Sequence, residues 1–230
     1  MSVTAVRSRI AILAALPREV APLVRDWPAP VVSRAQATSI WENDRAIVVC
    51  AGMGKERVTL ALQVAESRGP LRSVVSVGYA GALREGLGID GVHWPATVID
   101  GQTGERFPCE DGDGILVTSD HIVGRDEKLK LAAQWKADLV DMEAATVAKA
   151  AKLRSLPFRT VRAVSDPVGE KLPDLGRFTD QHGGFQSGKF AIYVALHPWL
   201  IPTVVRLGNQ SARASRAMAA ALLQFLRQAE

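Results

Sequence analysis

Segments of strand length alternate with helical segments along most of this chain. The apolar runs are rich in Val, Ile and Ala, and the segments between them repeat their apolar residues with a helical period. The predicted strands cover residues 9–16, 40–51, 73–77, 97–99, 114–118, 137–140 and 158–164. The predicted helices cover residues 19–27, 55–67, 127–135, 142–153 and 211–228. This alternation is typical of an α/β fold around a largely parallel or mixed sheet.

The composition limits the kinds of protein that this chain can be. With 230 residues, 47% of them hydrophobic and 23% charged, it is long enough for a sizeable core. We expect a single domain over residues 1–230. The formal charge of +4 comes from Lys and Arg residues that are scattered along the chain. Nucleic-acid binding needs a concentrated basic tract, so no nucleic-acid partner is predicted.

The first apolar run and the cysteines bear on the cellular location. The run IAILAAL, residues 10–16, is too short to cross a bilayer and is not followed by a small-residue cleavage site. We therefore expect a cytoplasmic protein without stable membrane insertion. Cys50 and Cys109 show no metal or redox spacing and fit reduced thiols. The four histidines also lack metal spacing, so no metal site is predicted.

Two acids stand where a predicted strand passes into a helix, in the stretch LVDMEAATVA. Asp141 and Glu143 follow the strand at 137–140, and Asp166 follows the strand at 158–164. The strand, the helix and the second strand form a βαβ unit, whose crossover makes the strands parallel if they share a sheet. Ligands of α/β proteins bind at the carboxyl ends of such strands. We therefore expect Glu143 and Asp166 to face one crevice.

Two further features follow predicted strands and are expected at the same edge. Glu19 follows the first strand, and a predicted glycine-rich turn follows the strand at 73–77. The turn consists of Gly78, Tyr79, Ala80 and Gly81. Its glycines permit close backbone approach to a ligand. Each feature also has a simpler explanation, because acids favour helix N-termini and glycines favour tight turns. Their common edge favours a shared site.

Six short blocks resemble, in order, signature blocks of the nucleoside phosphorylase superfamily. They are ALPREV, AGMGK, VGYAGAL, VTSD, VDMEAA and VRAVSD, spread over roughly residues 9 to 170. They are most similar to the branch that holds methylthioadenosine/S-adenosylhomocysteine nucleosidases. The resemblance implies a three-layer αβα sandwich with a central mixed sheet, a small nucleoside as substrate, no cofactor, and a homodimer or larger oligomer.

The resemblance also implies roles for the acids. Glu143 resembles the glutamate that holds the ribose hydroxyls beside the positive charge that develops as the glycosidic bond breaks, and Met142 resembles the residue that packs against the ribose. Asp166 resembles the aspartate that protonates or hydrogen-bonds purine N7, with Ser165 orienting it. A purine leaves a sugar poorly unless its ring is protonated, so this acid needs a raised pKa, which an apolar crevice could supply.

The segment after VTSD matches the region of the family that contacts the base. Ile122 and Val123 stand where that region packs against the base and offers main-chain contacts to it. His121, next to Asp120, is the one histidine near this region.

The nucleophile is expected to be water. Phosphorylases of the superfamily hold phosphate with arginines, where this chain has Glu19 and, near the second place, Ser76. A carboxylate repels a phosphate dianion, but it can accept a proton from attacking water. Phosphorolysis, with inorganic phosphate as co-substrate held by Arg18 and the predicted turn, stays open. Tyr79 stands where nucleosidases commonly have serine. A non-catalytic nucleoside-binding protein also stays open, whereas AGMGKE lacks the full glycine fingerprint of dinucleotide-binding reductases.

The substrate's 5′ group is the least specified feature. The connection between Gly91 and Val117 is shorter than the corresponding nucleosidase segment. Residues 197–228 are similar to the hopanoid-associated phosphorylase branch, whose expected substrate is adenosylhopane. A large apolar 5′ group would gain from burial against apolar surface. Alternatively, the apolar residues of this segment are core or dimer contacts; these are Trp199, Leu200, Ile201 and Val205.

Overall fold

The computed structural model describes residues 8–52, 54–89, 91–168, 193, 197 and 201–229. Its strands are β1 (Arg9–Ala14), β2 (Val31–Ser33), β3 (Thr38–Glu42), β4 (Ala46–Cys50), β5 (Leu71–Ala82), β6 (Val92–His93), β7 (Thr97–Asp100), β8 (Arg106–Pro108), β9 (Ile115–Thr118), β10 (Leu139–Asp141) and β11 (Phe158–Asp166). Its helices are α1 (Pro17–Val20), α2 (Lys55–Ser67), α3 (Arg125–Trp135), α4 (Ala144–Lys152) and α6 (Ile201–Gln228). Strands and helices alternate as the sequence predicts.

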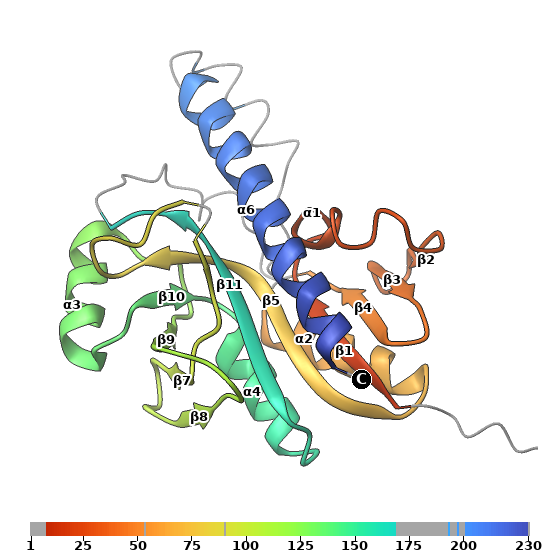
Figure 1. The fold of residues 1–230 in the computed structure, drawn as a ribbon. Coiled ribbons are helices and arrows are strands. Elements are labelled where there is room, and N and C mark those ends of the chain that lie inside the picture. Colours follow the sequence, from red (N-terminus) through yellow and green to blue (C-terminus); the bar gives the residue numbers. More distant parts are fainter. Residues whose placement is uncertain are drawn as a thin grey trace, which may run out of the picture.

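One mixed sheet of 11 strands forms the middle layer (Figure 1). Helices α2 and α4 contribute to the core on one face of the sheet, and α1 and α6 contribute to the core on the other face. The predicted three-layer α/β architecture is therefore confirmed. Alanines supply most of the buried side of α4, and they allow this helix to lie close to the strands.

The sheet joins two sets of parallel strands that run in opposite directions. Strands β4, β1, β5 and β11 are parallel to one another, and β10, β9 and β7 form the second set. The sets meet where β10 pairs antiparallel with the end of β5. In full, the strand order is β2-β3-β4-β1-β5-β10-β9-β7-β8, with β11 pairing with β5 and β6.

The ends of β1 and β10 face each other along one edge of β5. β11 occupies the other edge of β5, since it pairs with residues 74–81. β1 pairs with β5 as far as Val77, and β10 pairs with Ala82 and Gly81. The stretch from Gly78 to Ala80 therefore lies between two opposed strand ends, and the sheet opens there.

This topology corrects the predicted βαβ unit. β10, α4 and β11 do follow one another along the chain. However, β10 is antiparallel to β5 and β11 is parallel to it, so β10 and β11 run in opposite directions. Their carboxyl ends still come together, because the end of β10 faces the end of β1 and the end of β11 lies beside Gly81.

Three local predictions are also wrong. The predicted turn at residues 78–81 is strand, because β5 continues to Ala82. The predicted strand at residues 40–51 is the hairpin β3–β4, whose turn is closed by the Asn43 side chain accepting hydrogen bonds from the backbone of Arg45 and Ala46, both 2.9 Å. The predicted helix at residues 19–27 is only the short α1, after which Pro22 cannot continue the helix.

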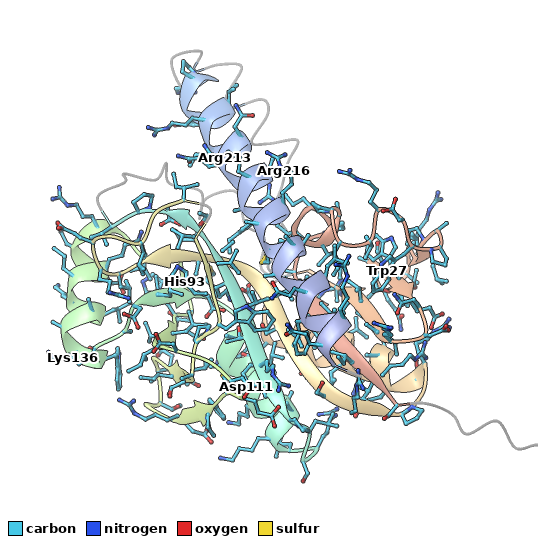
Figure 2. All side chains as sticks on the ribbon, in the orientation of Figure 1. Trp27, His93, Asp111, Lys136, Arg213 and Arg216 are labelled. Atoms are coloured by element: carbon cyan, nitrogen blue, oxygen red, sulfur yellow. The ribbon has the colours of Figure 1, made fainter. Side chains whose placement is uncertain are left out.

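Helix α6 buries one face and exposes the other. Ala214, Met218 and Leu222 are fully buried against the sheet, as the sequence predicts for this end of the helix. Arg213 and Arg216 project from the exposed face (Figure 2). Val205, near the helix start, is 55% exposed, so it is not a core residue of this chain. Trp199 and Leu200 lie outside the described residues, as does the side chain of Ile201.

Candidate active site

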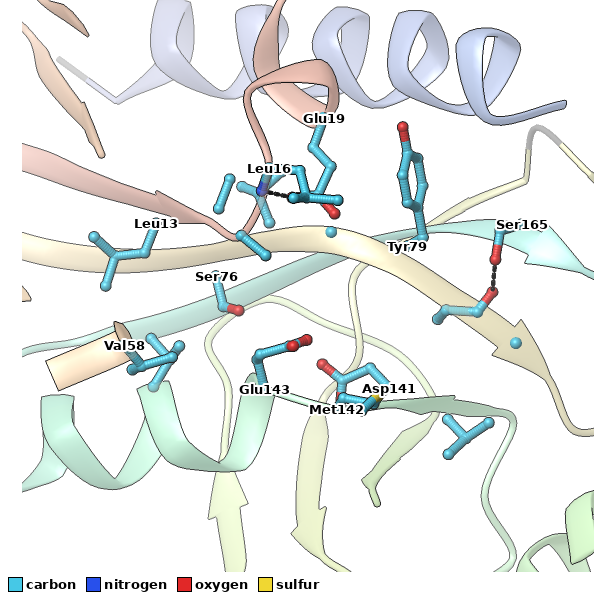
Figure 3. Close-up of a pocket in the computed structure, with 18 of the residues that line it drawn as sticks. Leu13, Leu16, Glu19, Val58, Ser76, Tyr79, Asp141, Met142, Glu143 and Ser165 are labelled. Carbon is cyan, nitrogen blue, oxygen red and sulfur yellow. Dashed lines mark hydrogen bonds between the residues drawn. The ribbon is translucent and has the colours of Figure 1, made fainter. Parts of the chain in front are cut away.

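A cavity of about 230 Å³ lies where the ends of β1 and β10 face each other along one edge of β5 (Figure 3). All eleven residues predicted for the site line this cavity. They are Glu19, Gly78, Tyr79, Ala80, Gly81, Ile122, Val123, Met142, Glu143, Ser165 and Asp166. The wall is formed by residues from the stretches 13–19, 52–61, 76–81, 121–128, 140–147 and 165–166, and most of the remaining lining is apolar. The acids predicted from separate strand ends therefore line one cavity.

Glu19 reaches the cavity from α1 (Figure 3). Pro17 starts this helix, and the Glu19 carboxylate turns back to accept a hydrogen bond of 2.8 Å from the backbone N–H of Leu16. Its burial raises the pKa of Glu19 to about 7, against smaller opposing effects of that hydrogen bond and of Arg162 and Arg18. Near neutral pH this carboxyl can therefore both accept and release a proton.

Glu143 is the residue at which α4 begins, and its carboxylate enters the same cavity (Figure 3). Burial, together with the negative charges of Asp141 and Glu19, raises the pKa of Glu143 to about 8 against the positive charge of Arg162. The influence of Glu19 on this pKa shows that the two carboxyls are electrostatic neighbours. Around neutral pH they are not both ionised.

Asp141, the other acid of LVDMEAATVA, has a structural role. It is buried, and its carboxylate accepts hydrogen bonds from Arg162 Nη2 at 2.6 Å, from Thr118 Oγ1 at 2.7 Å and from the backbone N–H of Ala144 at 2.9 Å. Arg162 also donates to the carbonyl and hydroxyl oxygens of Ser76, at 3.0 and 2.8 Å. The network joins β5, β9, β10, β11 and the start of α4, and so fixes the backbone that carries Glu143.

Asp166 is paired with Lys128, a residue that the sequence prediction missed. Lys128 Nζ lies 2.5 Å from Asp166 Oδ2, and Ser165 Oγ donates to Asp166 Oδ1 at 2.6 Å. The predicted link between Ser165 and Asp166 is therefore present. The expected apolar crevice around Asp166 is absent, because the Lys128 ammonium lies at hydrogen-bond distance from its carboxylate.

The glycine segment serves the site by leaving room rather than by turning. A Cβ on Gly81 would lie 2.9 Å from Asp166 Oδ2 and 3.1 Å from Lys128 Nζ, so a larger residue would displace these two side chains. Tyr79 points from β5 toward α6, where its hydroxyl lies 2.6 Å from Ser215 Oγ (Figure 3). The guanidinium carbon of Arg18 lies 5.9 Å from the centre of the Tyr79 ring. Tyr79 therefore forms a wall of the cavity that joins it to α6.

His121 lies at the rim of the cavity beside Ile122 and Val123. Its ring nitrogens lie 2.6 Å from Asp120 Oδ1 and 3.0 Å from Glu127 Oε2. These two hydrogen bonds raise the pKa of His121. Ile122 is 38% exposed, whereas Val123 is buried, so this segment offers an apolar surface between solvent and the cavity.

Two other findings concern ions and membranes. Within the described ranges, no group of three or more His, Cys, Asp or Glu side chains is placed to hold a metal ion. Cys50 and Cys109 are both free thiols. Among the helices that the structure describes, none is long and apolar enough to cross a bilayer.

The signals for the two missed residues differ. Arg162 is a charged residue between Val161 and Ala163 in a predicted strand, and a charge buried at such a position needs a partner. Lys128 stands in RDEKLK, where charged residues are expected on a solvated helix, so nothing in the local sequence distinguishes it.

Comparisons with known proteins agree with this architecture. The family model described as Phosphorylase superfamily matches residues 9–113 and 102–186. The methylthioadenosine/S-adenosylhomocysteine nucleosidase of Streptococcus pneumoniae superposes with a TM-score of 0.71 at 18% identity, over 96% of this chain and 100% of that one. The Helicobacter pylori enzyme of the same name gives 0.69 at 14% identity, over 96% and 98% of the two chains. Futalosine hydrolase of Helicobacter pylori gives 0.69 at 15%, with the same coverage. At these identities the likeness shows a shared fold. No sequence among the curated proteins matches.

Proposed function

Since this chain belongs to the phosphorylase superfamily, we propose that it hydrolyses the N-glycosidic bond of a 5′-modified adenine nucleoside and releases adenine. The observation that carries the proposal is the meeting of Glu19, Glu143 and Asp166 around one cavity. The names of the similar structures, nucleosidases and a futalosine hydrolase, support bond cleavage of this kind.

The three acids divide the reaction among base, sugar and water. Asp166 is the group at purine N7, and Ile122 and Val123 lie beside the base. Glu143 and Met142 hold the ribose. When the bond breaks, the sugar becomes oxocarbenium-like, and nearby carboxylates stabilise it. In the free protein Glu19 and Glu143 are not both ionised near neutral pH. Positive charge that develops on the sugar favours the ionised forms of Glu19 and Glu143. The two carboxylates therefore stabilise the sugar more strongly in the transition state than in the bound substrate.

Glu19 is the base for the attacking water. Its carboxylate lies just after the end of β1, and its pKa of about 7 suits proton transfer at neutral pH. Glu143, at the start of α4, lines the same cavity. A second candidate is phosphorolysis, which is favoured by one observation: Arg18 lines the same cavity. Phosphate bound there would lie next to Glu19, and their charges would repel each other.

The first test is the dependence on phosphate. We expect adenine release from methylthioadenosine, S-adenosylhomocysteine or adenosine to proceed at the same rate in phosphate-free buffer and in buffer with phosphate, because water is the nucleophile. The measurement is adenine formation by chromatography, with identification of the sugar product as free ribose or ribose 1-phosphate. An absolute requirement for phosphate would establish the second candidate. Tight adenine binding without turnover of any nucleoside would favour a non-catalytic binding protein.

The pH dependence gives a further expected result. A general base must be deprotonated to act, and the pKa of Glu19 is about 7 in the free protein. We therefore expect kcat/KM to fall about tenfold per pH unit below pH ~7 and to level off above it. The profile of kcat/KM between pH 5 and pH 9 measures this, since kcat/KM reports the free enzyme. A rate that stays constant down to pH 5 would contradict the role of Glu19.

The 5′ group can be identified by a substrate panel that includes adenosylhopane. Tyr79 connects the cavity wall to Ser211 and Ser215 of α6, so this helix borders the site. A preference for adenosylhopane over methylthioadenosine would support a large apolar 5′ group, as the resemblance of residues 197–228 suggests. The reverse preference would support a small thioether.

A further inference from the structure

Lys128 differs from the other residues of α3 in being fully buried. Among the residues of this helix, all of which the structure describes, it is the only buried one and is 2% exposed. Leu131, Ala132 and Trp135 of the same helix are partly buried. A helix normally buries apolar side chains and leaves its lysines in water, because removing an ammonium from water is costly. The position of Lys128 therefore calls for a specific partner.

That partner is Asp166. Lys128 Nζ lies 2.5 Å from Asp166 Oδ2, and it also lies 3.4 Å from the carbonyl oxygen of Asp166 and 3.3 Å from that of Pro167. An ammonium has three N–H donors, and here each has an acceptor. Gly81 leaves the space that the pair needs, since a Cβ there would lie within 3.1 Å of Nζ. The sequence distance between the pair is 38 residues, so only the fold brings them together.

Both carboxylate oxygens of Asp166 accept a hydrogen bond from a neighbouring side chain. Lys128 donates to one carboxylate oxygen, and Ser165 Oγ donates to the other at 2.6 Å. An ionised carboxylate in this setting is an acceptor only. Departure of a purine nevertheless needs a proton at N7. The Lys128 ammonium carries an acidic proton at hydrogen-bond distance from Asp166, and both residues line the cavity.

We infer that Lys128 is a positioning residue that supplies the proton for purine N7 through Asp166. The inference rests on the function proposed above. As the bond between the sugar and the base breaks, its electron pair stays with the base. One proton passes from Nζ to the Asp166 carboxylate, and one passes from that carboxyl group to N7. The products are a neutral amine, an ionised carboxylate and neutral adenine, and the amine regains a proton from solvent after adenine leaves.

The experiment compares two variants of Lys128 on two leaving groups. Lys128→Met removes both the charge and the proton. Lys128→Arg keeps the charge, but a guanidinium does not give up its proton. Adenine release from the best nucleoside substrate requires protonation of the base. Nitrophenolate release from 4-nitrophenyl β-D-riboside does not. Lys130→Met, the same substitution at an exposed position of α3, is the matched control.

We expect both Lys128 variants to release adenine at least about 100-fold more slowly than the wild type, with nitrophenolate release within about twofold of it. Retained nitrophenolate release also shows that the variants are folded. Lys130→Met is expected to match the wild type on both substrates. Wild-type adenine release by Lys128→Arg, or an equal loss on both substrates, would overturn the inference. If the wild type cleaves no nucleoside at all, the proposed function fails instead, so the two failures are distinguishable.

Discussion

Asp166→Asn is expected to lower kcat for adenine release by about 10²- to 10⁴-fold, the usual contribution of a general acid. An amide cannot carry a proton from Lys128 to the base, and its NH₂ group cannot accept a hydrogen bond from N7–H. The measurement is single-turnover adenine release at saturating substrate, which separates chemistry from binding and product release. Nitrophenolate release from the aryl riboside should change far less.

The same variant removes the counter-charge of a buried lysine, so its stability must be measured separately. Breaking a buried ion pair on one side costs about 3–5 kcal/mol. The assay therefore belongs well below the melting temperature, which circular dichroism provides. Asp126→Asn, at an exposed position of α3, is the matched control and should behave as the wild type. An unchanged rate in Asp166→Asn would remove Asp166 from the mechanism.

Glu19→Gln is expected to slow hydrolysis by at least about 100-fold and, at the same time, to stabilise the protein at alkaline pH. The loss of rate follows because glutamine cannot accept a proton from water. The gain in stability follows because burial holds the pKa of Glu19 near 7, above its ordinary value of 4.5. The folded state therefore binds this proton more tightly than the unfolded state does.

The direction of the pH effect follows from linkage. Glu19 is neutral in both states well below pH 4.5, so it costs nothing there. Between pH 4.5 and pH 7 the unfolded chain ionises while the folded one does not, so folding stability is lost over this range and stays low above it. Removing the charge should restore about 1–3 kcal/mol at pH 8 and less at pH 5.

Thermal melting at the two pH values measures this difference, with about 2–4 °C expected per kcal/mol for a chain of this size. Glu56→Gln, an exposed residue at the start of α2, is the matched control and should show neither effect. A Glu19→Gln protein that hydrolyses at the wild-type rate would overturn the hydrolytic assignment. A stability gain that is the same at pH 5 and pH 8 would contradict the raised pKa.

The alternation of apolar runs and helical stripes was enough to find most of the central elements. Burial on both faces gives β1 a continuous apolar run and makes β5 and β11 rich in Val and Ala, and this pattern is visible without a structure. The β3–β4 hairpin was missed because its turn depends on the side chain of Asn43, and the strands on both sides are equally apolar. The short strands β2, β6 and β8 are too brief to show any period.

The residues predicted for the site line one cavity, but the predicted βαβ unit is not what brings them together. Each acid was placed at a strand end, and this placement is a local property. The crossover predicts parallel β10 and β11 if they share a sheet, whereas β10 enters the sheet against the direction of β5. Glu19 and Glu143 share a cavity because two opposed sets of strands end at the same gap.

The sequence of 230 residues is enough to predict most strands, most helices and the acids at the strand ends, because the pattern of apolar residues that marks each element repeats over a few neighbouring positions. The partners of the buried charges are decided only by the tertiary structure. Asp141 with Arg162, and Lys128 with Asp166, are separated by 21 and 38 positions, and each pair sits at hydrogen-bond distance only after the strands have taken their places. Desolvation makes these contacts strong and selective, and desolvation exists only inside the packed molecule.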